Sequence, residues 1–434
     1  MDNKGFLIAA ASSNSGKTTA TMGLLRALSN RGITVQPYKC GPDYIDTMFH
    51  EAASGRASVN LDTFMASEQH VRELYHRYGA DADLCIVEGV MGLFDGYDRW
   101  HGSSAEIAML LDLPVVLIVN AKSVAYSVAP LIYGFKHFNP DVRLAGVIFN
   151  MVASESHYAY LKAACEDAGA VCLGYMSRNS DLVVPGRHLG LTIQASRDLE
   201  TLISLAAEEA ERHVEIEKIV ASPSPSQGGG QLFLDVSAPL LGRGRGRIAI
   251  AKDEAFNFMY RANIDALQSV GDVVFFSPLR DDTIPECDAL YLPGGYPELF
   301  ADQLQSNVSM RHSLRRYAER GGRIYAECGG FMYLCQDIDG VEMCGVLPLR
   351  ATMRNARLHL GYRQMPNGMR GHEFHYSEVI EPASLPDGMS AERCQQTAKG
   401  APVGTPIYRY RNVVAGYTHW YWGEHADALR VLFS

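Results

Sequence analysis

One run of small residues, Ala11–Thr19 (ASSNSGKTT), constrains the fold more than any other segment. It fits the phosphate-loop pattern G-x-x-x-x-G-K-[ST], except that Ala11 stands at the first glycine. A strand-length apolar segment (6–11) precedes it, and a segment of helical period (17–30) follows it. In this setting backbone amides at a helix N-terminus surround phosphate groups, a lysine reaches the terminal phosphates, and a threonine hydroxyl can ligate Mg²⁺. The alternative is a Ser/Gly-rich N-cap turn. The residues assigned to ATP are Ser15, Gly16, Lys17, Thr18 and Thr19, with Thr18 also assigned to Mg²⁺.

The rest of the chain predicts two α/β domains. At 434 residues the chain is too long for one ordinary core. Apolar strand-length runs alternate with helix-period segments in both halves, which favours parallel sheets covered by helices. The break is a stretch rich in Ser, Pro and Gly that begins at Ala221. We therefore predict a first domain at 1–220, a flexible linker at 221–246 and a second domain at 247–434.

Composition excludes several classes of protein. The chain is 47% hydrophobic and 20% charged, which is typical of a folded globular protein. Its net charge of −10 gives no electrostatic footprint for nucleic acid or an anionic membrane. No apolar run approaches the roughly 20 residues of a membrane span, and no secretory signal is recognisable. Nine cysteines without a Cys-x-x-Cys pair favour reduced, buried thiols and a cytoplasmic location over disulfides or structural zinc.

Acidic residues follow two of the predicted strands in the first half. Glu88 ends the apolar run 84–88, where an open α/β sheet places ligand groups, and Asp95 follows nearby. Glu88 is therefore a candidate ligand of Mg²⁺, the alternative being a solvated strand end. The loop 39–46 (KCGPDYID) brings two carboxylates and an aromatic ring onto a Gly-Pro turn. That loop could equally be a turn in which Asp43 caps a helix.

A candidate nucleophile lies in the second half. Cys328 stands between a predicted strand, 323–327, and a helix that opens with Gly329 and Gly330. This strand–turn–helix pattern exposes a nucleophile at a helix N-terminus, where backbone amides favour a thiolate. The alternative is a buried small residue at a tight turn. The Gly294–Gly295 pair follows another strand and is a source of oxyanion donors.

A thiol nucleophile needs a base, and four histidines near the C-terminus are candidates. His419 is the best placed of them, because it comes directly after an apolar strand. His359, His372 and His375 could bind substrate or satisfy local carbonyls. A metal site at His372 and His375 lacks a third ligand at suitable spacing.

Seven motifs together resemble the cobyrinate (or hydrogenobyrinate) a,c-diamide synthases, a family of corrinoid glutamine-dependent amidotransferases. The resemblance covers nearly the whole chain except the linker, and the motifs follow in the family's order. They are Ser15–Thr19, Lys39–Asp46, Val87–Gly96, Gly102–Ala108, Arg187–Leu191, Pro293–Glu298 and Ala326–Tyr333.

The resemblance implies a fold and an activity. It implies a P-loop domain like that of dethiobiotin synthetase, joined to a class I glutamine amidotransferase domain. The implied enzyme uses ATP and Mg²⁺ to activate two corrinoid acetate groups, and amidates them with ammonia taken from L-glutamine by Cys328 and His419. Oxyanion donors would come from Gly294, Gly295 and Gly329. The ligase-site residues implied in this way are Asp43, Tyr44, Ile45, Glu88 and Asp95, with Glu88 and Asp95 near metal and phosphate, and Lys39 is assigned to binding of the nucleotide.

The sequence departs from related patterns at two further positions. Triad-type amidotransferases usually carry a Glu two residues after the histidine, whereas Tyr421 stands there. The corrinoid subfamily is similar in this respect, which suggests a less strongly activated dyad. A P-loop switch of the partitioning or division-site kind, the alternative from another class, would carry a signature lysine where this chain has Ser12.

Three further alternatives concern the reaction and the assembly. The substrate could be cobyrinic acid, its cobalt-free analogue hydrogenobyrinic acid, or a nickel sirohydrochlorin. The motifs could also belong to a cobyric acid synthase, a related enzyme, but the loop Gly41–Asp46 disfavours that interpretation. The second domain could also be purely structural, with free ammonia as the nitrogen donor. A homodimer is the default expectation for the assembly.

Overall fold

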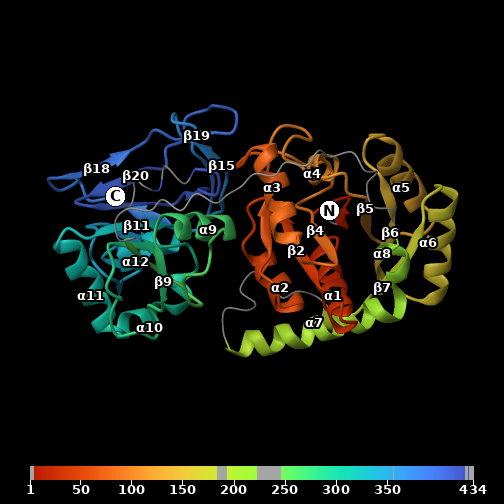
Figure 1. The fold of residues 1–434 in the computed structure, drawn as a ribbon, viewed down its shortest axis with the longest axis horizontal. Helices are drawn as coiled ribbons and strands as arrows, with labels where there is room; N and C mark the ends of the chain where they lie inside the picture. The colour runs from red at the N-terminus through yellow and green to blue at the C-terminus, as the bar shows by residue number, and fades with distance from the viewer. Residues whose placement is uncertain (1–3, 183–192, 222–245, 355, 426–428, 430–434) are drawn as a thin grey trace. The chain divides into compact units, whose positions relative to one another are not determined.

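The computed structural model describes residues 4–182, 193–221, 246–354, 356–425 and 429. The chain divides into two compact units, Met1–Leu234 and Asp235–Ser434 (Figure 1). Almost all of the predicted linker 221–246 lies outside the described residues, as does the motif Arg187–Leu191. No helix among the described residues is long and apolar enough to span a membrane.

Unit 1 is built on a seven-stranded sheet in the order β3-β2-β4-β1-β5-β6-β7, and every pair of neighbours is parallel. Its inner strands are buried on both faces, so they read as continuous apolar runs. The strands are β1 (Gly5–Ala10), β2 (Val35–Cys40), β3 (Val59–Leu61), β4 (Leu84–Glu88), β5 (Val115–Asn120), β6 (Leu144–Val152) and β7 (Cys172–Ser177).

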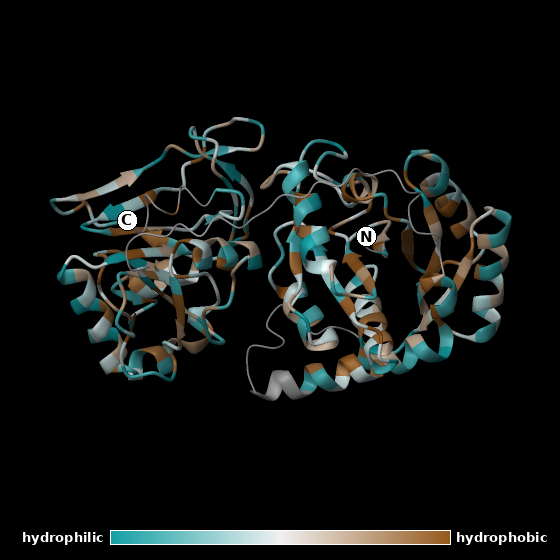
Figure 2. Cartoon of the chain, viewed as in Figure 1, coloured by the Kyte–Doolittle hydropathy of each residue, from teal (hydrophilic) through white to brown (hydrophobic). Residues whose placement is uncertain are grey.

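Helices cover both faces of this sheet, with brown apolar stretches turned toward the strands (Figure 2). The helix that follows the phosphate loop packs closely on a long later helix, since a side chain at Gly23 would lie 2.5 Å from the carbonyl of Ala206. The helices are α1 (Lys17–Asn30), α2 (Ile45–Ser54), α3 (Glu68–Gly79), α4 (Ser104–Leu110), α5 (Val128–His137), α6 (Glu155–Asp167), η1 (Ser180–Leu182), α7 (Ile193–His213) and α8 (Ile216–Val220).

Unit 2 contains a second seven-stranded sheet, in the order β18-β20-β21-β11-β10-β8-β9. The strands from β9 to β21 are parallel, and β20 and β18 extend that edge in antiparallel fashion. The strands are β8 (Arg247–Ala251), β9 (Asp272–Phe276), β10 (Ala289–Leu292), β11 (Arg323–Glu327), β18 (Met389–Glu392), β20 (Ile407–Tyr410) and β21 (Val413–Gly416).

Two four-stranded sheets and several helices complete unit 2. The sheet orders are β13-β12-β14-β17 and β19-β15-β16-β22. The strands are β12 (Asp337–Ile338), β13 (Val341–Glu342), β14 (Arg350–Thr352), β15 (His359–Gln364), β16 (Arg370–His375), β17 (Glu378–Ile380), β19 (Gln396–Thr397) and β22 (His419–Trp420). The helices are α9 (Arg261–Val270), η2 (Pro297–Phe300), α10 (Ala301–Ser306), α11 (Val308–Glu319) and α12 (Gly329–Leu334).

The strands predicted at 84–88 and 323–327 coincide with β4 and β11. The helical period of residues 257–270 also predicts a helix over that whole range, and its start is wrong, because α9 spans Arg261–Val270. The preceding residues are held in another arrangement, because the Asp253 carboxylate caps a turn and Phe258 bridges to Gly294. All nine cysteines are free and seven of them are buried, as the composition predicts.

Candidate active sites

The phosphate loop joins β1 to α1 in a conformation that requires glycine. Gly16 has φ of 91°, and a side chain there would lie 2.0 Å from the Asn150 amide nitrogen. That amide, on β6, donates to the Ser15 carbonyl at 3.0 Å. The loop is therefore shaped by its own glycine and braced by a neighbouring strand, whereas Ala11 at the first glycine position has negative φ.

Lys17 is buried at the start of α1, with its ammonium group turned onto the loop after β4. Its Nζ donates to the Met91 carbonyl at 2.6 Å. Burial lowers the pKa of Lys17, the nearby Lys39 lowers it further, and Glu88 and Asp95 partly oppose this. A poorly solvated cation with few anionic partners is well suited to bind phosphate oxygens.

Glu88 is fully buried at the end of β4, in a cluster of polar groups. Its Oε1 accepts hydrogen bonds from the Thr18 hydroxyl and the Lys39 ammonium, both at 2.9 Å. Its Oε2 accepts from His50 Nε2 at 2.7 Å. Burial alone would raise the pKa of Glu88, but Lys39 and His50 outweigh it and hold that pKa well below its ordinary value.

The same contacts test whether these residues suit Mg²⁺. The Thr18 hydroxyl and the Glu88 carboxylate lie within hydrogen-bonding distance, so one small cation could contact both oxygens. Lys39 also donates to Asp46 at 2.5 Å. Lys39 would therefore keep an anionic partner if Glu88 bound a metal ion. This oxygen donor set fits a hard divalent cation.

Other residues assigned to the ligase site have local structural partners. The Asp43 carboxylate accepts hydrogen bonds from the Ile45 and Asp46 amides at 2.9 Å, so it caps α2, as one of the two sequence interpretations predicts. Tyr44 is buried, and Ile45 packs against the core of unit 1. None of these contacts tests a role in chemistry.

Two more assigned residues also contact the backbone. The Asp95 carboxylate accepts from the Gly92 amide at 2.9 Å and lies close enough to act on Lys17. The Thr19 hydroxyl donates to the Leu182 carbonyl at 3.3 Å, which links the start of α1 to η1.

Sequence reasoning missed Asp46 as a separate candidate and missed His50 altogether. Both lie on α2, four residues apart and therefore on one helix face. His50 is fully buried between Glu88 and Ser58, whose hydroxyl lies 3.0 Å from Nδ1. The i, i+4 spacing of an acid and a histidine directly after the Gly-Pro-Asp turn was the signal that could have found them.

In unit 2, Cys328 lies at a sharp turn between β11 and α12. Its φ of 46° and ψ of −106° fall in a strained region for a residue with a side chain. Cys328 as a whole residue is 4% exposed, and its Sγ lies 3.7 Å from the Phe374 carbonyl on β16. This is the elbow that the sequence pattern predicts, since the strain turns the side chain out of the strand.

Two backbone amides face this thiol. Burial raises the pKa of Cys328, Glu298 raises it further, and hydrogen bonding from the Gly329 and Gly295 amides lowers it. Amides directed at the sulfur are also close to the oxygen of a carbonyl attacked by that sulfur. Gly294, assigned to the same role, has another neighbour: a side chain there would lie 2.2 Å from His419 Cε1.

His419 begins β22 and is enclosed on several sides. Its ring stacks on that of His372, with the centroids 4.9 Å apart and the planes 17° apart. Its Nδ1 lies 3.7 Å from the carboxylate of Glu327, the residue before Cys328. His372 contacts the Tyr260 hydroxyl through Nδ1 at 2.7 Å. The base candidate thus lies next to the strand that carries the cysteine.

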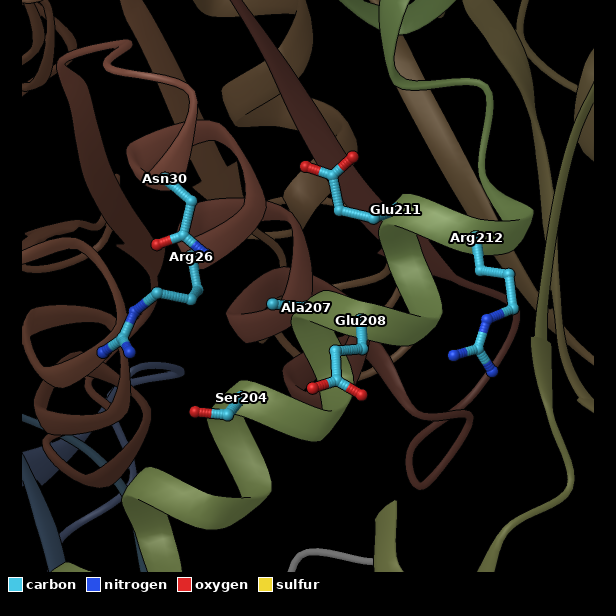
Figure 3. A pocket seen from close by; sticks show the side chains of 7 residues that line it. All are labelled: Arg26, Asn30, Ser204, Ala207, Glu208, Glu211 and Arg212. Carbon is cyan, nitrogen blue, oxygen red and sulfur yellow. The ribbon is translucent and has the colours of Figure 1, made fainter.

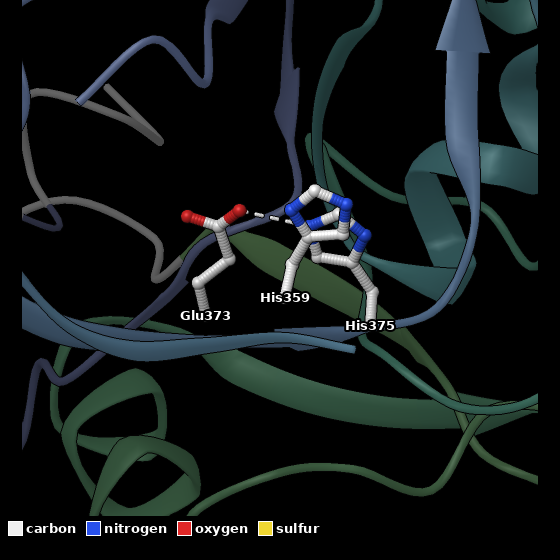
Figure 4. A group of neighbouring side chains, drawn as sticks. All are labelled: His359, Glu373 and His375. Carbon is white, nitrogen blue, oxygen red and sulfur yellow. Dashed lines mark hydrogen bonds and ion pairs between the residues drawn. The ribbon is translucent and has the colours of Figure 1, made fainter. Parts of the chain in front are cut away.

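The structure groups His375 with His359 and Glu373, a set that the sequence analysis did not consider as metal ligands. His359, Glu373 and His375 place ligand atoms within 4.8 Å of one another, because β15 pairs with β16 and sets His359 opposite His375 (Figure 4). Glu373 is already bound to His375 at 2.8 Å and to Arg363 at 2.5 Å. A guanidinium in the group supplies the positive charge, so the cluster is a buried ion-pair network whose structure requires no cation.

A surface depression of unit 1 lies away from the phosphate loop. It lies between α1 and α7, and its lining includes Arg26 and Asn30 near the far end of α1 (Figure 3). Arg26 is paired with Glu200, so the charges there are balanced locally. The phosphate loop stands at the opposite end of α1, which separates this depression from the Lys17 site.

Family comparisons match both units. A CobQ/CobB/MinD/ParA nucleotide-binding domain matches residues 6–191, and a CobB/CobQ-like glutamine amidotransferase domain matches residues 247–427. A crystal structure of a glutamine amidotransferase aligns with 43% of this chain and 96% of its own, at 17% identity and a TM-score of 0.30, too low to carry further argument.

Curated relatives align over nearly their whole length. A cobyrinate a,c-diamide synthase of Listeria innocua is 38% identical over 99% of this chain and 98% of its own. That of Syntrophotalea carbinolica is 41% identical over 98% and 96%. A hydrogenobyrinate a,c-diamide synthase of Brucella anthropi is 41% identical over 96% and 98%. The chain therefore belongs to the family of cobyrinate and hydrogenobyrinate a,c-diamide synthases, glutamine-dependent ligases with a nucleotide-binding domain.

Proposed function

We propose that this chain amidates the a- and c-acetate carboxylates of cobyrinic acid, with ATP as activator and L-glutamine as nitrogen donor. One observation carries the proposal: a single chain holds a phosphate loop beside the buried Glu88 cluster and, in its other unit, an elbow cysteine faced by two backbone amides. The first arrangement suits phosphoryl transfer and the second suits attack on an amide.

The glutaminase half-reaction belongs to unit 2. Cys328 attacks the side-chain amide of glutamine while His419 accepts the thiol proton and passes it to the leaving nitrogen. The Gly295 and Gly329 amides stabilise the oxyanion, and ammonia leaves as a thioester forms. Water then hydrolyses the thioester to glutamate. Burial raises the pKa of the resting thiol, so proton transfer to His419 is coupled to attack.

The ligase half-reaction belongs to unit 1. Lys17 and the loop amides position the ATP phosphates, so that a corrinoid carboxylate can attack the γ-phosphorus, form an acyl phosphate and release ADP. Thr18 and Glu88 are the residues that would hold Mg²⁺, which neutralises phosphate charge when bound. Ammonia then displaces phosphate from the acyl group and leaves a primary amide. By resemblance Asp43, Tyr44 and Ile45 also belong to this site, and Asp95 lies with Glu88 near metal and phosphate.

The decisive experiment compares wild type with Cys328→Ser. Each protein is incubated with cobyrinic acid, Mg-ATP and either glutamine or ammonium chloride, and the product mass is measured. Wild type should add two amide groups with either donor, and the variant should do so with ammonia alone. Unchanged glutamine use by Cys328→Ser would contradict the site assignment, and would favour a second domain kept only for structure.

Hydrogenobyrinic acid is the second candidate substrate, because a relative at 41% identity is named for it. Nickel sirohydrochlorin is the third. Parallel assays on all three tetrapyrroles identify the substrate by the highest kcat/KM. If none of them is converted, the proposal fails and a nucleotide-gated P-loop switch becomes the better interpretation.

The setting of the reaction follows from more general properties. Nine free cysteines suit a reducing compartment, which supports a cytoplasmic location. Two-fold symmetric dimers are the commonest assembly of soluble proteins, and Tyr133 on α5 and Phe138 directly after that helix are more than half exposed. We infer a homodimer on these grounds, and sedimentation of wild type against Phe138→Ser would test it.

A further inference from the structure

The position where an acid is expected beside the base does not hold one. Tyr421 stands two residues after His419, and its ring packs against Tyr260 with the centroids 5.5 Å apart. A phenol in an aromatic contact cannot supply the fixed negative charge that orients a histidine and stabilises its protonated form. If the site holds such a charge, another element must provide it.

Glu327 places a carboxylate next to His419. Its Oε2 lies 3.7 Å from His419 Nδ1, and the two side chains are 2% and 1% exposed. At this separation and burial, the carboxylate and a protonated imidazole attract each other with little screening by solvent. The contact reaches Nδ1, the nitrogen that an orienting carboxylate holds when Nε2 exchanges the proton.

The carboxylate of Glu327 is itself held by neutral donors. The Tyr291 hydroxyl donates to Oε2 at 2.8 Å, and the Trp420 amide donates to Oε1 at 3.0 Å. Burial and this carboxylate raise the pKa of Tyr291 well above its ordinary value, so the phenol remains a donor. Because Trp420 follows His419 directly, Glu327 joins the strand of the nucleophile to the strand of the base.

The other groups described around His419 and Glu327 differ in charge and in place. His372 stacks on its other face, and burial, His419 and Arg363 hold the pKa of His372 well below its ordinary value, so that ring is neutral. Tyr260 contacts His372, and the buried phenols of Tyr291 and Tyr325 border Glu327. Glu298 acts on the Cys328 thiol from η2. Glu327 is therefore an anionic group placed to stabilise a proton on His419.

We propose that Glu327 is the positioning residue of the glutaminase site, replacing the acid that triad-type amidotransferases carry two residues after the histidine. Glu327 at the end of β11, Cys328 directly after it and His419 at the start of β22 then form a catalytic triad in place of a dyad. This inference rests on the proposed hydrolysis of glutamine by Cys328 and His419.

The test compares Glu327→Gln with Tyr421→Phe as the matched control. Glutamate release from glutamine is followed across pH, together with cobyrinic acid amidation driven by ammonium chloride. Glu327→Gln should lower kcat/KM for glutamine about 10²-fold. It should also move the acid limb of the pH profile, since the variant removes a negative charge 3.7 Å from the proposed base. Ammonia-driven synthesis should stay within about twofold of wild type, and Tyr421→Phe should match wild type in all three measurements.

Two results would overturn the proposal. If Glu327→Gln keeps nearly the wild-type kcat/KM for glutamine, the reaction does not depend on the charge of Glu327. A slower enzyme whose acid limb stays in place shows that Glu327 only packs the site. If Glu327→Gln does not fold, Glu327→Asp serves instead: it keeps the charge, so a shifted acid limb in that variant also contradicts the proposal. Cys328→Ser is measured in the same assays and should abolish glutamine use. This variant tests the proposed glutaminase function, whereas Glu327→Gln tests only the positioning role.

Discussion

Glu88 in unit 1 and Glu327 in unit 2 occupy equivalent places and have opposite surroundings. Each is the last residue of an inner strand of a parallel sheet, and each is almost completely buried. Lys39 and His50 surround Glu88, whereas a phenol, a backbone amide and a histidine surround Glu327. One fold position thus holds an acid bound by a fixed cation in unit 1 and an acid bound by neutral donors beside a histidine in unit 2.

The difference follows from the chemistry that each unit is proposed to perform. Phosphoryl transfer handles several negative charges at once, so cations such as Lys17 and Lys39 must be in place before the reaction. Amide hydrolysis begins with neutral glutamine and a neutral thiol, and charge develops only as Cys328 attacks. A fixed cation in unit 2 is unnecessary, whereas aligned amides and an oriented base are required.

The largest expected effect comes from Glu88→Gln. Its loss leaves Lys39 and His50 without their shared buried anion, and removes an oxygen ligand that Mg²⁺ would use. Synthesis with glutamine and synthesis with ammonia should both fall about 10³-fold. Glutamate release by the same sample should stay within about threefold of wild type. Equal loss of glutamate release would show that the two sites are not separable.

The next largest effect concerns the close approach of the Gly294 backbone to the His419 ring in unit 2. A side chain at Gly294 would lie 2.2 Å from His419 Cε1, so Gly294→Ala must displace the imidazole. A displacement of about 1 Å costs roughly 10²-fold in rate, and glutamine-dependent synthesis should fall by that factor. Ammonia-dependent synthesis should be unaffected. Gly404→Ala is the matched control, since a side chain there meets no atom within 4 Å.

Sequence patterns predicted local features of both sites well. The Ser15–Thr19 loop and the Cys328 elbow are each specified by consecutive residues, because a glycine at positive φ and a strand–turn–helix boundary leave little choice of conformation. The strands around them were predicted from apolar runs of the right length. Such features depend on neighbours in the sequence, so one sequence suffices to find them.

Groups supplied by distant segments were predicted poorly. His50 meets Glu88 across 38 residues, and Glu327 meets His419 across 92 residues. Spacing along the segment 372–375 does not reveal the contact with His359, because His359 lies on the paired strand. Strand register decides these contacts, and register is not visible in spacing alone.

A smaller effect should follow from changes at His50, which orients Glu88. His50→Ala removes the hydrogen bond to Oε2, and the Mg²⁺ concentration for half-maximal synthesis should rise about tenfold. His50→Gln can still donate to that oxygen and should recover most of the loss. If both variants keep the wild-type Mg²⁺ dependence, Glu88 does not act through the metal.

The smallest expected effect concerns Glu298, which brings an unneeded negative charge into the region of Cys328. Burial raises the pKa of Glu298 to about 7 in the folded chain, above its ordinary value of 4.5. The folded state therefore holds this proton more tightly than the unfolded state, and wild type loses stability as pH rises from about 4.5 to 7. Glu298→Gln avoids that loss. Its free energy of unfolding should exceed that of wild type by on the order of 1 kcal/mol at pH 8, with allowance for partial exposure, and the gain should vanish near pH 4.

Calorimetry of the full chain at the two pH values measures this difference directly. The same variant should alkylate faster at Cys328 with iodoacetamide, because Glu298 raises the pKa of that thiol. Asp302→Asn, on the neighbouring helix α10, is the control for a change of net charge alone. If Glu298→Gln is no more stable than wild type at pH 8, the carboxylate has a favourable partner there. Glu298 would then resemble Glu88, a buried carboxylate that a partner group stabilises, and the two units would differ less.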